Sequence, residues 1–462
     1  PGRGSAAGSL VAYSLGITQV DPIKFGLQFE RFLRSDAVDY PDIDYDVSEP
    51  MILKDLLIER WGDDTVAPIS NWNTLQLKSL IKDISKLYNI PFTESNAVTG
   101  KMMTEATSAA KKAHGIKAGV YNPTFEEVKK YSSTLQAFLR KYPDVATHVD
   151  ELYGQVRLSS DEDKNVRQTP WAEGQNVRHL EPMGFIKFDL LGLSTLRMIE
   201  GAVSHILRRH CGVENPEFSD ILNFYNKNLH PDVVDLDDRK VYENVFHKGN
   251  WAGTFQFTES GVQGLCKQVK PTGIIDISSV TSTFRPGPLS ANVDKELVKA
   301  RRSPGMVGYI NDVHREVTEE TSGFLLFQEQ IAMLAHKLGK DLSLDEGNLL
   351  RKVLTKKGTG KTAKVKEALY EKFMQGCLVS HGMKTKQAQR LWDTFEYFSG
   401  YGFNKSHAVC YSIISYQCAW LFTYYPAEWM AAFLDKEPES RKESAISTAK
   451  QFGFQIAPLN VN

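Results

Sequence analysis

The sequence predicts an α+β fold with few strands and many helices. Residues 38–47 alternate as a strand does, and residues 184–192 form a second short, buried strand that ends in a turn. Helical patterns dominate residues 74–142 and, again, the chain from about residue 198 onward. A chain of 462 residues also exceeds one compact core, so we expect several domains or subdomains.

The first strand is expected between a loop and a helix. Residues 2–8 are small and loop-like, and residues 9–15 have a helical pattern. After the strand, Ser48 and Pro50 give the start signal of a helix that ends at residues 61–62.

A helical insertion is expected to follow. Residues 75–87 and 125–139 have helical patterns, and no convincing strand pattern occurs within residues 74–142. Residues 145–197 return to a mixed character and include the second strand.

Composition suits a soluble globular protein, with 42% hydrophobic and 24% charged residues. The net charge of -1 argues weakly against a polyanionic partner, so the local distribution of basic residues must decide. Five cysteines without metal-ligand spacing indicate reduced thiols. Residues 408–434 are very apolar, but Ser412, Gln417 and Pro426 interrupt them, which indicates a buried helix and not a membrane span. Because the chain starts at Pro1 within a glycine-rich motif, we expect a piece of a longer protein.

Three acidic residues follow one another at a spacing of two. If Asp42, Asp44 and Asp46 lie on a strand, their carboxylates project from one face and repel one another. A cation would relieve that repulsion, and oxygen ligands favour Mg²⁺ or Mn²⁺. The alternative is an acidic strand end that faces solvent.

Asp189 is a further candidate because apolar residues surround it in the sequence. An unpaired carboxylate in an apolar setting is costly, so it needs a partner. That partner is either a metal ion or Lys187, two residues away on the same face of a strand.

The glycine- and serine-rich segment 1–9 opens a helix and is a candidate phosphate-binding loop. Glycines let backbone amides approach an anion, the helix start favours negative charge, and Arg3 adds a cation. A plain tight turn is the alternative. The order of loop, Asp-x-Asp strand and distant third aspartate is that of nucleotidyltransferases of the polymerase-beta type. Residues 358–362 resemble the end of a Walker A motif, but Thr355 stands where that motif requires glycine, so we reject an ATP site there.

A basic stripe lies in the helical second half. Seven basic residues and no acidic one occur between positions 351 and 366, namely Arg351, Lys352, Lys356, Lys357, Lys361, Lys364 and Lys366. Together with Arg285, the pair Arg301 and Arg302, Lys405 and His407, they are candidates for contacts with a triphosphate or a template backbone. A solvated helix and loop is the alternative.

Nine segments in order resemble one family, the C-family replicative DNA polymerases, which are the alpha subunits of bacterial DNA polymerase III and their phage relatives. The segments are PGRGSAAGSL at 1–10, FERFL at 29–33, PDID at 41–44, KFDLLGL at 187–193, TFQF at 254–257, FRPGPL at 284–289, QEQ at 328–330, GYGFNKSH at 400–407 and YPAE at 425–428. They span nearly the whole chain.

The resemblance implies a polymerase-beta-like nucleotidyltransferase palm, a helical thumb inserted into it and large, mainly helical fingers. The expected domains are palm at 1–73 and 145–197, thumb at 74–144 and fingers at 198–462. The family's PHP domain would precede Pro1, and its clamp-binding, helix-hairpin-helix and OB regions would follow the last residue.

The resemblance also implies the site. The two Mg²⁺ ions, which Mn²⁺ can replace, are expected on Asp42, Asp44 and Asp189, without Asp46. Triphosphate or active-site contacts are implied for Gly4, Ser5, Arg31, Lys187, Arg351 and Lys405. Charge and position add Arg3, Lys352 and His407 to the expected nucleotide-binding residues. The expected DNA-binding residues are Arg285, Lys356, Lys357 and Lys361.

The implied activity is DNA-templated DNA synthesis in the cytoplasm of a bacterial or phage-infected cell. Primer–template DNA and dNTPs are the expected partners, with a sliding clamp and an exonuclease reached through regions outside this chain. Neither a membrane contact nor 3′–5′ exonuclease activity is expected.

Two departures from the family pattern leave alternatives open. Residues 155–169 replace an Arg-His-Ala and Gly-Gly-Val segment, and Arg351 with Lys352 stands where paired arginines are usual. One alternative is an impaired polymerase fragment that binds primer–template DNA or needs the preceding part of the protein. The other is a metal-dependent phosphodiesterase, which would not need the glycine–serine loop.

Overall fold

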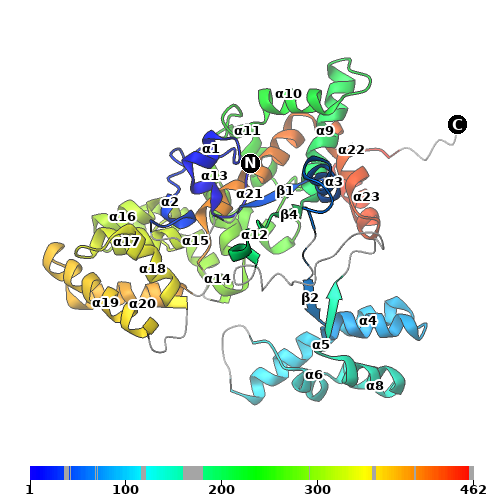
Figure 1. The fold of residues 1–462 in the computed structure, drawn as a ribbon, viewed down its shortest axis with the longest axis horizontal. Helices are drawn as coiled ribbons and strands as arrows, with labels where there is room; N and C mark the ends of the chain where they lie inside the picture. Colours follow the sequence, from blue (N-terminus) through cyan, green and yellow to red (C-terminus); the bar gives the residue numbers. More distant parts are fainter. Residues whose placement is uncertain are drawn as a thin grey trace. The chain divides into compact units, whose positions relative to one another are not determined.

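The structure is a computed structural model, and it divides into two compact units. It describes residues 1–35, 41, 43–67, 69, 71–115, 121–159, 180–290, 292–355, 361–399 and 402–456. Pro1–Ile52 and Phe188–Asn462 form the larger unit, and Leu53–Lys187 form the inserted unit. The α+β prediction is confirmed, because helices predominate and the described strands form two sheets of two strands each (Figure 1).

The N-terminal part of the larger unit contains the predicted loop and helix. Of the strand predicted over 38–47, residues 44–47 form β1, and residues 38–40 and 42 lie outside the described residues. The elements of this part are η1 (Ala6–Gly8), α1 (Leu10–Ser14), α2 (Phe29–Phe32), β1 (Asp44–Val47) and the beginning of α3 (Pro50–Trp61). The side chain of Ser9 accepts a hydrogen bond from the Ala12 amide and so caps α1. The predicted start and end of α3 are confirmed.

The inserted unit packs helices around a core of its own (Figure 1). After the end of α3, its elements are β2 (Asn71–Thr74), α4 (Leu77–Leu87), α5 (Phe92–Ala113), α6 (Phe125–Tyr131), α7 (Ser133–Lys141), α8 (Pro143–Leu152), β3 (Val156–Ser159) and η4 (Glu181–Met183). β2 and β3 pair antiparallel.

One predicted helix of the inserted unit is wrong. Residues 125–139 form two helices, because Ser132 has an extended backbone and ends α6. Its hydroxyl oxygen accepts from the Leu135 amide, which caps α7, and its hydroxyl donates to Glu105. An apolar periodicity that continues through both helices hid this cap from the sequence.

The larger unit continues from the second strand into a long series of helices. These elements are β4 (Asp189–Gly192), α9 (Ser194–His210), α10 (Phe218–Asn228), α11 (Arg239–Val241), η5 (Tyr242–His247), α12 (Ser260–Val269), α13 (Ile274–Thr283), α14 (Pro286–Ser290), α15 (Val293–Arg302), η6 (Pro304–Met306), α16 (Asp312–Thr318), η7 (Glu319–Thr321), α17 (Gln328–Leu338), α18 (Leu344–Thr355), α19 (Lys361–Gln375), η8 (Gly376–Ser380), α20 (Thr385–Ser399), α21 (Lys405–Tyr424), α22 (Pro426–Lys436), η9 (Glu439–Arg441) and α23 (Lys442–Gln451).

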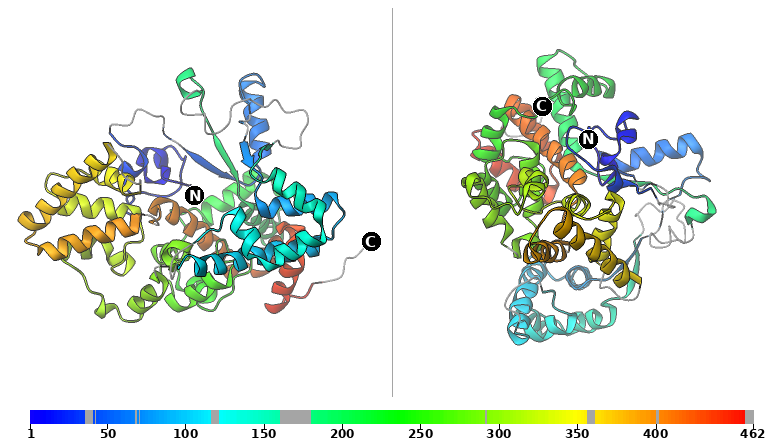
Figure 2. Two further views of the ribbon diagram at one scale, coloured as in Figure 1. Left: turned by 90° about the horizontal axis from the view of Figure 1, so that it is seen from below. Right: turned by 90° about the vertical axis from the view of Figure 1, so that its left-hand side faces the viewer.

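Two apolar cores organise these helices. One surrounds α21, which is apolar on all sides and packs against α13, α22 and α9. The other joins α17 to α20, which form one group in each view of Figures 1 and 2. None of the helices that the structure describes combines the length and the apolar character that a membrane crossing requires.

β1 and β4 form a parallel pair, although they are far apart in the sequence. Parallel neighbours need a long crossover between them, and the inserted unit lies in this connection. Two contacts hold the pair together at the carboxyl ends of its strands. Pro50 packs so close to Gly192 that a Cβ there would lie 3.1 Å from its ring. Arg197 at the start of α9 donates to the carbonyl oxygen of Ser48.

Candidate active site

The parallel strands bring two of the expected metal ligands together. Asp44 of β1 is in register with Asp189 of β4, so the two side chains leave the same face of the sheet from neighbouring strands. The side chain of Asp44 is 29% exposed, which leaves it accessible. Asp42, the third expected ligand, lies outside the described residues.

The apolar surroundings expected for Asp189 differ in the structure. β4 has four residues instead of a buried strand from 184 to 192, and Phe185, Ile186 and Phe188 are 47%, 68% and 54% exposed. Within the described residues the sheet consists of β1 and β4 alone, and two short strands do not bury the residues that precede β4. Burial therefore does not require Asp189 to have a partner, and its place beside Asp44 is the stronger argument for function.

The glycine–serine loop lies against Asp44. Gly4 has a φ of +65°, and a Cβ built on it would lie 3.4 Å from Oδ2 of Asp44. Nε of Arg3 is 3.9 Å from the same Oδ2. Ser5 precedes η1, and its carbonyl oxygen accepts from the Gly8 amide. The loop predicted to hold a triphosphate is thus next to an aspartate predicted to hold its metal ions.

Asp46 has a different environment from Asp44. Its side chain is 8% exposed, and its Oδ1 accepts from Nη1 of Arg3 at 3.0 Å and from the Tyr411 hydroxyl at 3.3 Å. Arg3 also contacts the Tyr411 hydroxyl. Asp46 therefore connects the loop, β1 and α21.

His407 on the first turn of α21 supports the loop as a neutral ring. The Gly4 amide donates to its Nδ1 at 3.2 Å, so the ring proton is on Nε2. Burial, followed by the charges of Arg3 and Arg285, lowers the pKa of His407 to about 4. At neutral pH, His407 is a hydrogen-bond acceptor at one nitrogen and a donor at the other.

Two arginines predicted to bind nucleotide converge on one glutamine. Oε1 of Gln328 accepts from Arg31 at 3.3 Å and from Arg351 at 3.0 Å. In the described residues, the buried Nε of each arginine lacks a hydrogen-bond acceptor. Burial and the neighbouring charge of Arg31 lower the pKa of Arg351 to about 10, which still leaves it protonated at neutral pH. An anion placed here would satisfy donors and offset the repulsion between two cations.

Lys405 is joined to the residue next to Gln328, namely Glu329. The Lys405 amide donates to both carboxylate oxygens of the buried Glu329. Burial raises the pKa of Glu329. Nζ of Lys405 forms an ion pair with Glu320 at 2.8 Å, and its side chain is 8% exposed. Asn404 caps α21 by accepting from the His407 amide, which positions both functional residues.

The remaining predicted residues are less closely grouped. Arg285 stacks over the ring of Phe403 at 4.4 Å. Lys352 is exposed on α18, and Lys187 belongs to the inserted unit. Lys356, Lys357 and the side chain of Lys361 lie outside what the structure describes.

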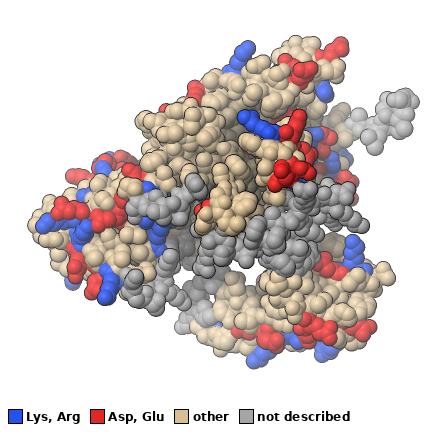
Figure 3. Space-filling view, viewed as in Figure 1, with Lys and Arg blue, Asp and Glu red and all other residues tan. Residues whose placement is uncertain are grey.

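The basic stripe is not uniform. Arg351 is buried, Lys366 pairs with Glu396 of α20 at 2.6 Å, and Figure 3 shows basic and acidic side chains intermixed over α19 and α20 at its left edge. Glu396 of the neighbouring helix α20 interrupts the stripe, which the local sequence could not reveal.

Sequence reasoning did not find the partners of the site residues. Gln328 was part of a matching segment but had no predicted role, and neither Glu320 nor Tyr411 was proposed for the site. The carboxylate oxygens of Asp44 and Asp189 fit a hard cation such as Mg²⁺. Among the residues that the structure describes, no three His, Cys, Asp or Glu side chains form a complete metal-binding group.

Known proteins resemble the chain over its whole length. The family model described as "Bacterial DNA polymerase III alpha NTPase domain" matches residues 1–192, and "Bacterial DNA polymerase III alpha subunit finger domain" matches residues 217–377. The chain is 32% identical to the DNA polymerase III subunit alpha of Campylobacter jejuni, with 100% of the chain and 38% of the relative covered. It is 31% identical to that of Aquifex aeolicus, with 100% of the chain and 40% of the relative covered. It is 32% identical to that of Thermus aquaticus, with 100% of the chain and 37% of the relative covered. The chain thus spans well under half the length of these curated relatives.

Proposed function

Since the chain belongs to the family of bacterial DNA polymerase III alpha subunits, we propose that it is the catalytic core for DNA-templated DNA synthesis. It would add dNTPs to a primer 3′ end by two-metal-ion nucleotidyl transfer and release pyrophosphate. The observation that carries this proposal is the register of Asp44 with Asp189, next to the glycine–serine loop.

Asp42, Asp44 and Asp189 are the proposed ligands of two Mg²⁺ ions, which Mn²⁺ can replace. When bound, such ions activate the primer hydroxyl and neutralise the charge of the triphosphate and leaving group. Asp46 is not assigned to the metals, because the family resemblance leaves it out and its charge is already paired with Arg3 at 3.0 Å.

The chain's own donors are proposed to orient the triphosphate. Arg31 and Arg351 have spare donors beside Gln328, and neutral His407 has a donor at Nε2. Lys405 would exchange its ion pair with Glu320 for a phosphate oxygen. The amides of Gly4 and Ser5, together with Arg3, Lys187 and Lys352, complete the proposed nucleotide contacts. Arg285, Lys356, Lys357 and Lys361 are proposed to contact DNA.

The domain roles are part of the same proposal. Residues 1–73 and 145–197 would form the palm, 74–144 the thumb and 198–462 the fingers. The core shared by α4 to α7 and the finger-domain match at 217–377 support this assignment. α8, whose Val145 and Val149 belong to the same core, crosses the proposed boundary at residue 144. Primer–template DNA, dNTPs, a sliding clamp and an exonuclease are the proposed partners in a bacterial or phage-infected cytoplasm.

Primer extension by the intact protein tests the proposal. Asp42→Asn, Asp44→Asn and Asp189→Asn should each lower kcat/KM by at least about a thousandfold, because each removes one oxygen ligand's charge from the site. Asp46→Asn should have a smaller effect, since Asn retains an oxygen for Arg3 and Tyr411.

Asp55→Asn is the matched control, because Asp55 is exposed on α3. Full activity of Asp189→Asn would overturn the assignment. An impaired polymerase remains the alternative, motivated by the departure at 155–169. It would show primer–template binding without extension even when the complete protein is used.

A further inference from the structure

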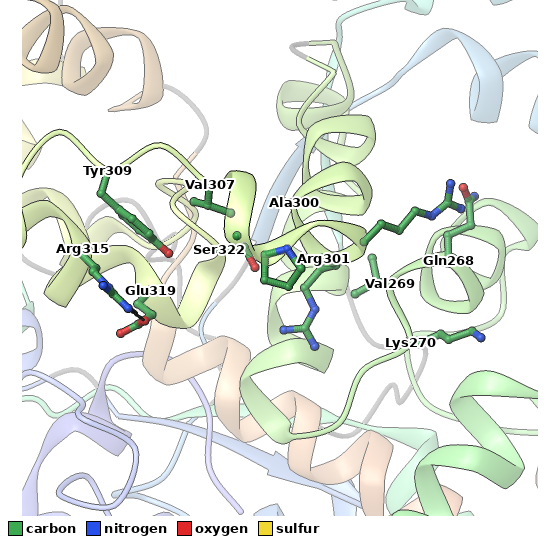
Figure 4. Close-up of a pocket in the computed structure, with 13 residues that line it drawn as sticks. Gln268, Val269, Lys270, Ala300, Arg301, Val307, Tyr309, Arg315, Glu319 and Ser322 are labelled. Carbon is green, nitrogen blue, oxygen red and sulfur yellow. Dashed lines mark hydrogen bonds and ion pairs between the residues drawn. The ribbon is translucent and has the colours of Figure 1, made fainter.

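A basic pocket lies in the larger unit. The proposed function gives its lining residues no role, although the sequence made two of them, Arg301 and Arg302, candidates for phosphate contacts. Its volume is about 750 Å³, and it is lined by the ends of α12 and α15, by the segment around η6, and by α16 and η7. Figure 4 shows side chains from these separate elements around the pocket.

The pocket lining carries an excess of positive charge. Lys270, Arg301, Arg302 and Arg315 line it together with a single acidic residue, Glu319. Arg315 pairs with Glu319 at 3.0 Å. In the described part of the chain, Lys270 and Arg302 have no ion-pair or hydrogen-bond partner for their side chains. The pocket therefore has two cations available for an anionic ligand.

The side chain of Arg301 in the pocket is held in place by a buried carboxylate. Arg301 donates to Oδ2 of Asp276, which also accepts from the amide and hydroxyl of Thr272. Asp276 is buried in the first turn of α13. A guanidinium that is fixed in this way loses little conformational entropy when a ligand binds.

An aromatic ring is part of the same lining. Tyr309 lines the pocket, and the guanidinium of Arg315 lies 5.7 Å from its ring centroid. Cations that track phosphates, combined with an aromatic side chain on which a base stacks, are characteristic of sites for single-stranded nucleic acid. A base-paired duplex would not present an unstacked base to Tyr309.

The pocket and the candidate active site share one element. Glu319 of η7 pairs with Arg315 of the pocket, and the next residue, Glu320, pairs with Lys405 of the active site. η7 also contacts α13, which packs on α21. A single nucleic-acid strand that passes the active site could therefore also reach the pocket, and its backbone phosphates would be the anions that bind there.

We propose that this pocket binds the unpaired template strand ahead of the primer end, with phosphate on Lys270 and Arg302 and a base on Tyr309. The proposal rests on the proposed polymerase function. It assigns the pocket a contact that is blind to sequence, because phosphates and aromatic stacking do not distinguish bases.

Fluorescence anisotropy with the intact protein tests the proposal. The probes are a primer–template with a long 5′ template overhang and the same duplex with a one-nucleotide overhang. Lys270→Ala combined with Arg302→Ala should weaken binding of the long overhang about tenfold and reduce the slope of log affinity against log salt by about 1.4. Binding of the one-nucleotide overhang, and its extension, should not change.

The matched control is Lys295→Ala combined with Lys299→Ala, which removes the same charge from exposed positions of α15 outside the pocket. Tyr309→Ala should weaken binding of the long overhang between about fivefold and 150-fold, whereas Tyr309→Phe should retain it.

Unchanged affinity for the long overhang in both the double variant and Tyr309→Ala would overturn the proposal. ATP is measured as a third probe. If the double variant loses ATP binding but keeps its affinity for the long overhang, the proposal is also overturned, because the pocket would then hold a free nucleotide. The assay needs no turnover. An inactive Asp189→Asn protein therefore retains the overhang preference, which separates failure of this proposal from failure of the proposed function.

Discussion

At the scale of single residues, the neutral state of His407 depends on what surrounds it. Arg3 and Arg285 lower its pKa in addition to burial, and the Gly4 amide occupies Nδ1. A proton added at Nδ1 would break this hydrogen bond and place a third cation beside two arginines. His407 therefore connects the conformation of the phosphate-binding loop to pH.

This environment predicts a pH dependence of stability. The pKa of His407 is about 4 in the folded chain and about 6.5 for an ordinary histidine. The unfolded chain binds the extra proton first, so stability is fully present above about pH 6.5 and falls as the pH drops towards 4. The contribution is at most about 3 kcal/mol. Between pH 7 and pH 5, the unfolding midpoint of the natural protein should fall more than that of His407→Gln. Equal changes would show that the loop does not depend on the neutral ring.

At the scale of elements, the first loop and the helices after it depend on close backbone approach. The carbonyl oxygen of Gln28 lies 2.6 Å from the position that a Cβ on Gly8 would occupy. A side chain cannot be accommodated there unless η1 moves away from the start of α2. The loop is rich in glycine for this packing as well as for an anion.

Replacement of this glycine should therefore be costly. Gly8→Ala should lower the unfolding free energy by about 1–3 kcal/mol and reduce primer extension, because the clash is with backbone. Gly100→Ala is the control, since Gly100 lies within α5 with open space around it and alanine favours a helix by about 0.5–1 kcal/mol. Chemical denaturation and primer extension of both variants provide the comparison. A neutral Gly8→Ala would show that η1 adjusts without loss.

At the scale of the whole molecule, the two units have separate apolar cores. Met102 is fully buried in the core of α4 to α8, and Ile414 is fully buried in the core around α21. No residue is shared by these two core clusters. Local opening of one unit should therefore leave the other protected.

Hydrogen exchange of core variants tests this independence. Met102→Ala should destabilise the inserted unit by about 2–5 kcal/mol and accelerate amide exchange in α4, α5 and α8. Exchange in α21 should not change. Ile414→Ala is the reciprocal variant, which should accelerate exchange in α21 and spare α5. If either substitution accelerates both regions equally, the cores unfold as one cooperative unit.

The local sequence predicted well where the signal was local. Ser48 and Pro50 indicated the start of α3, and the alternating acids indicated β1. The apolar run at 408–434 was correctly expected to be helical and buried, but it forms two helices, α21 and α22, that meet at Tyr425 before Pro426. The prediction from local sequence failed where a distant side chain or a single capping residue determines where a helix ends. Ser132 divides a helix through its own hydroxyl and through Glu105, and no periodicity shows this.

The sequence alone determined the family and the α+β class and predicted which acids and bases form the site, because these depend on residue type and order along the chain. Tertiary structure decided which of them meet. Only the parallel pairing of β1 with β4 places Asp44 beside Asp189, across the whole inserted unit. Only packing makes His407 neutral and connects Asp46 to Arg3 and Tyr411. The physical reason is that burial, charge pairing and strand register depend on distances in space, which separation along the chain does not determine.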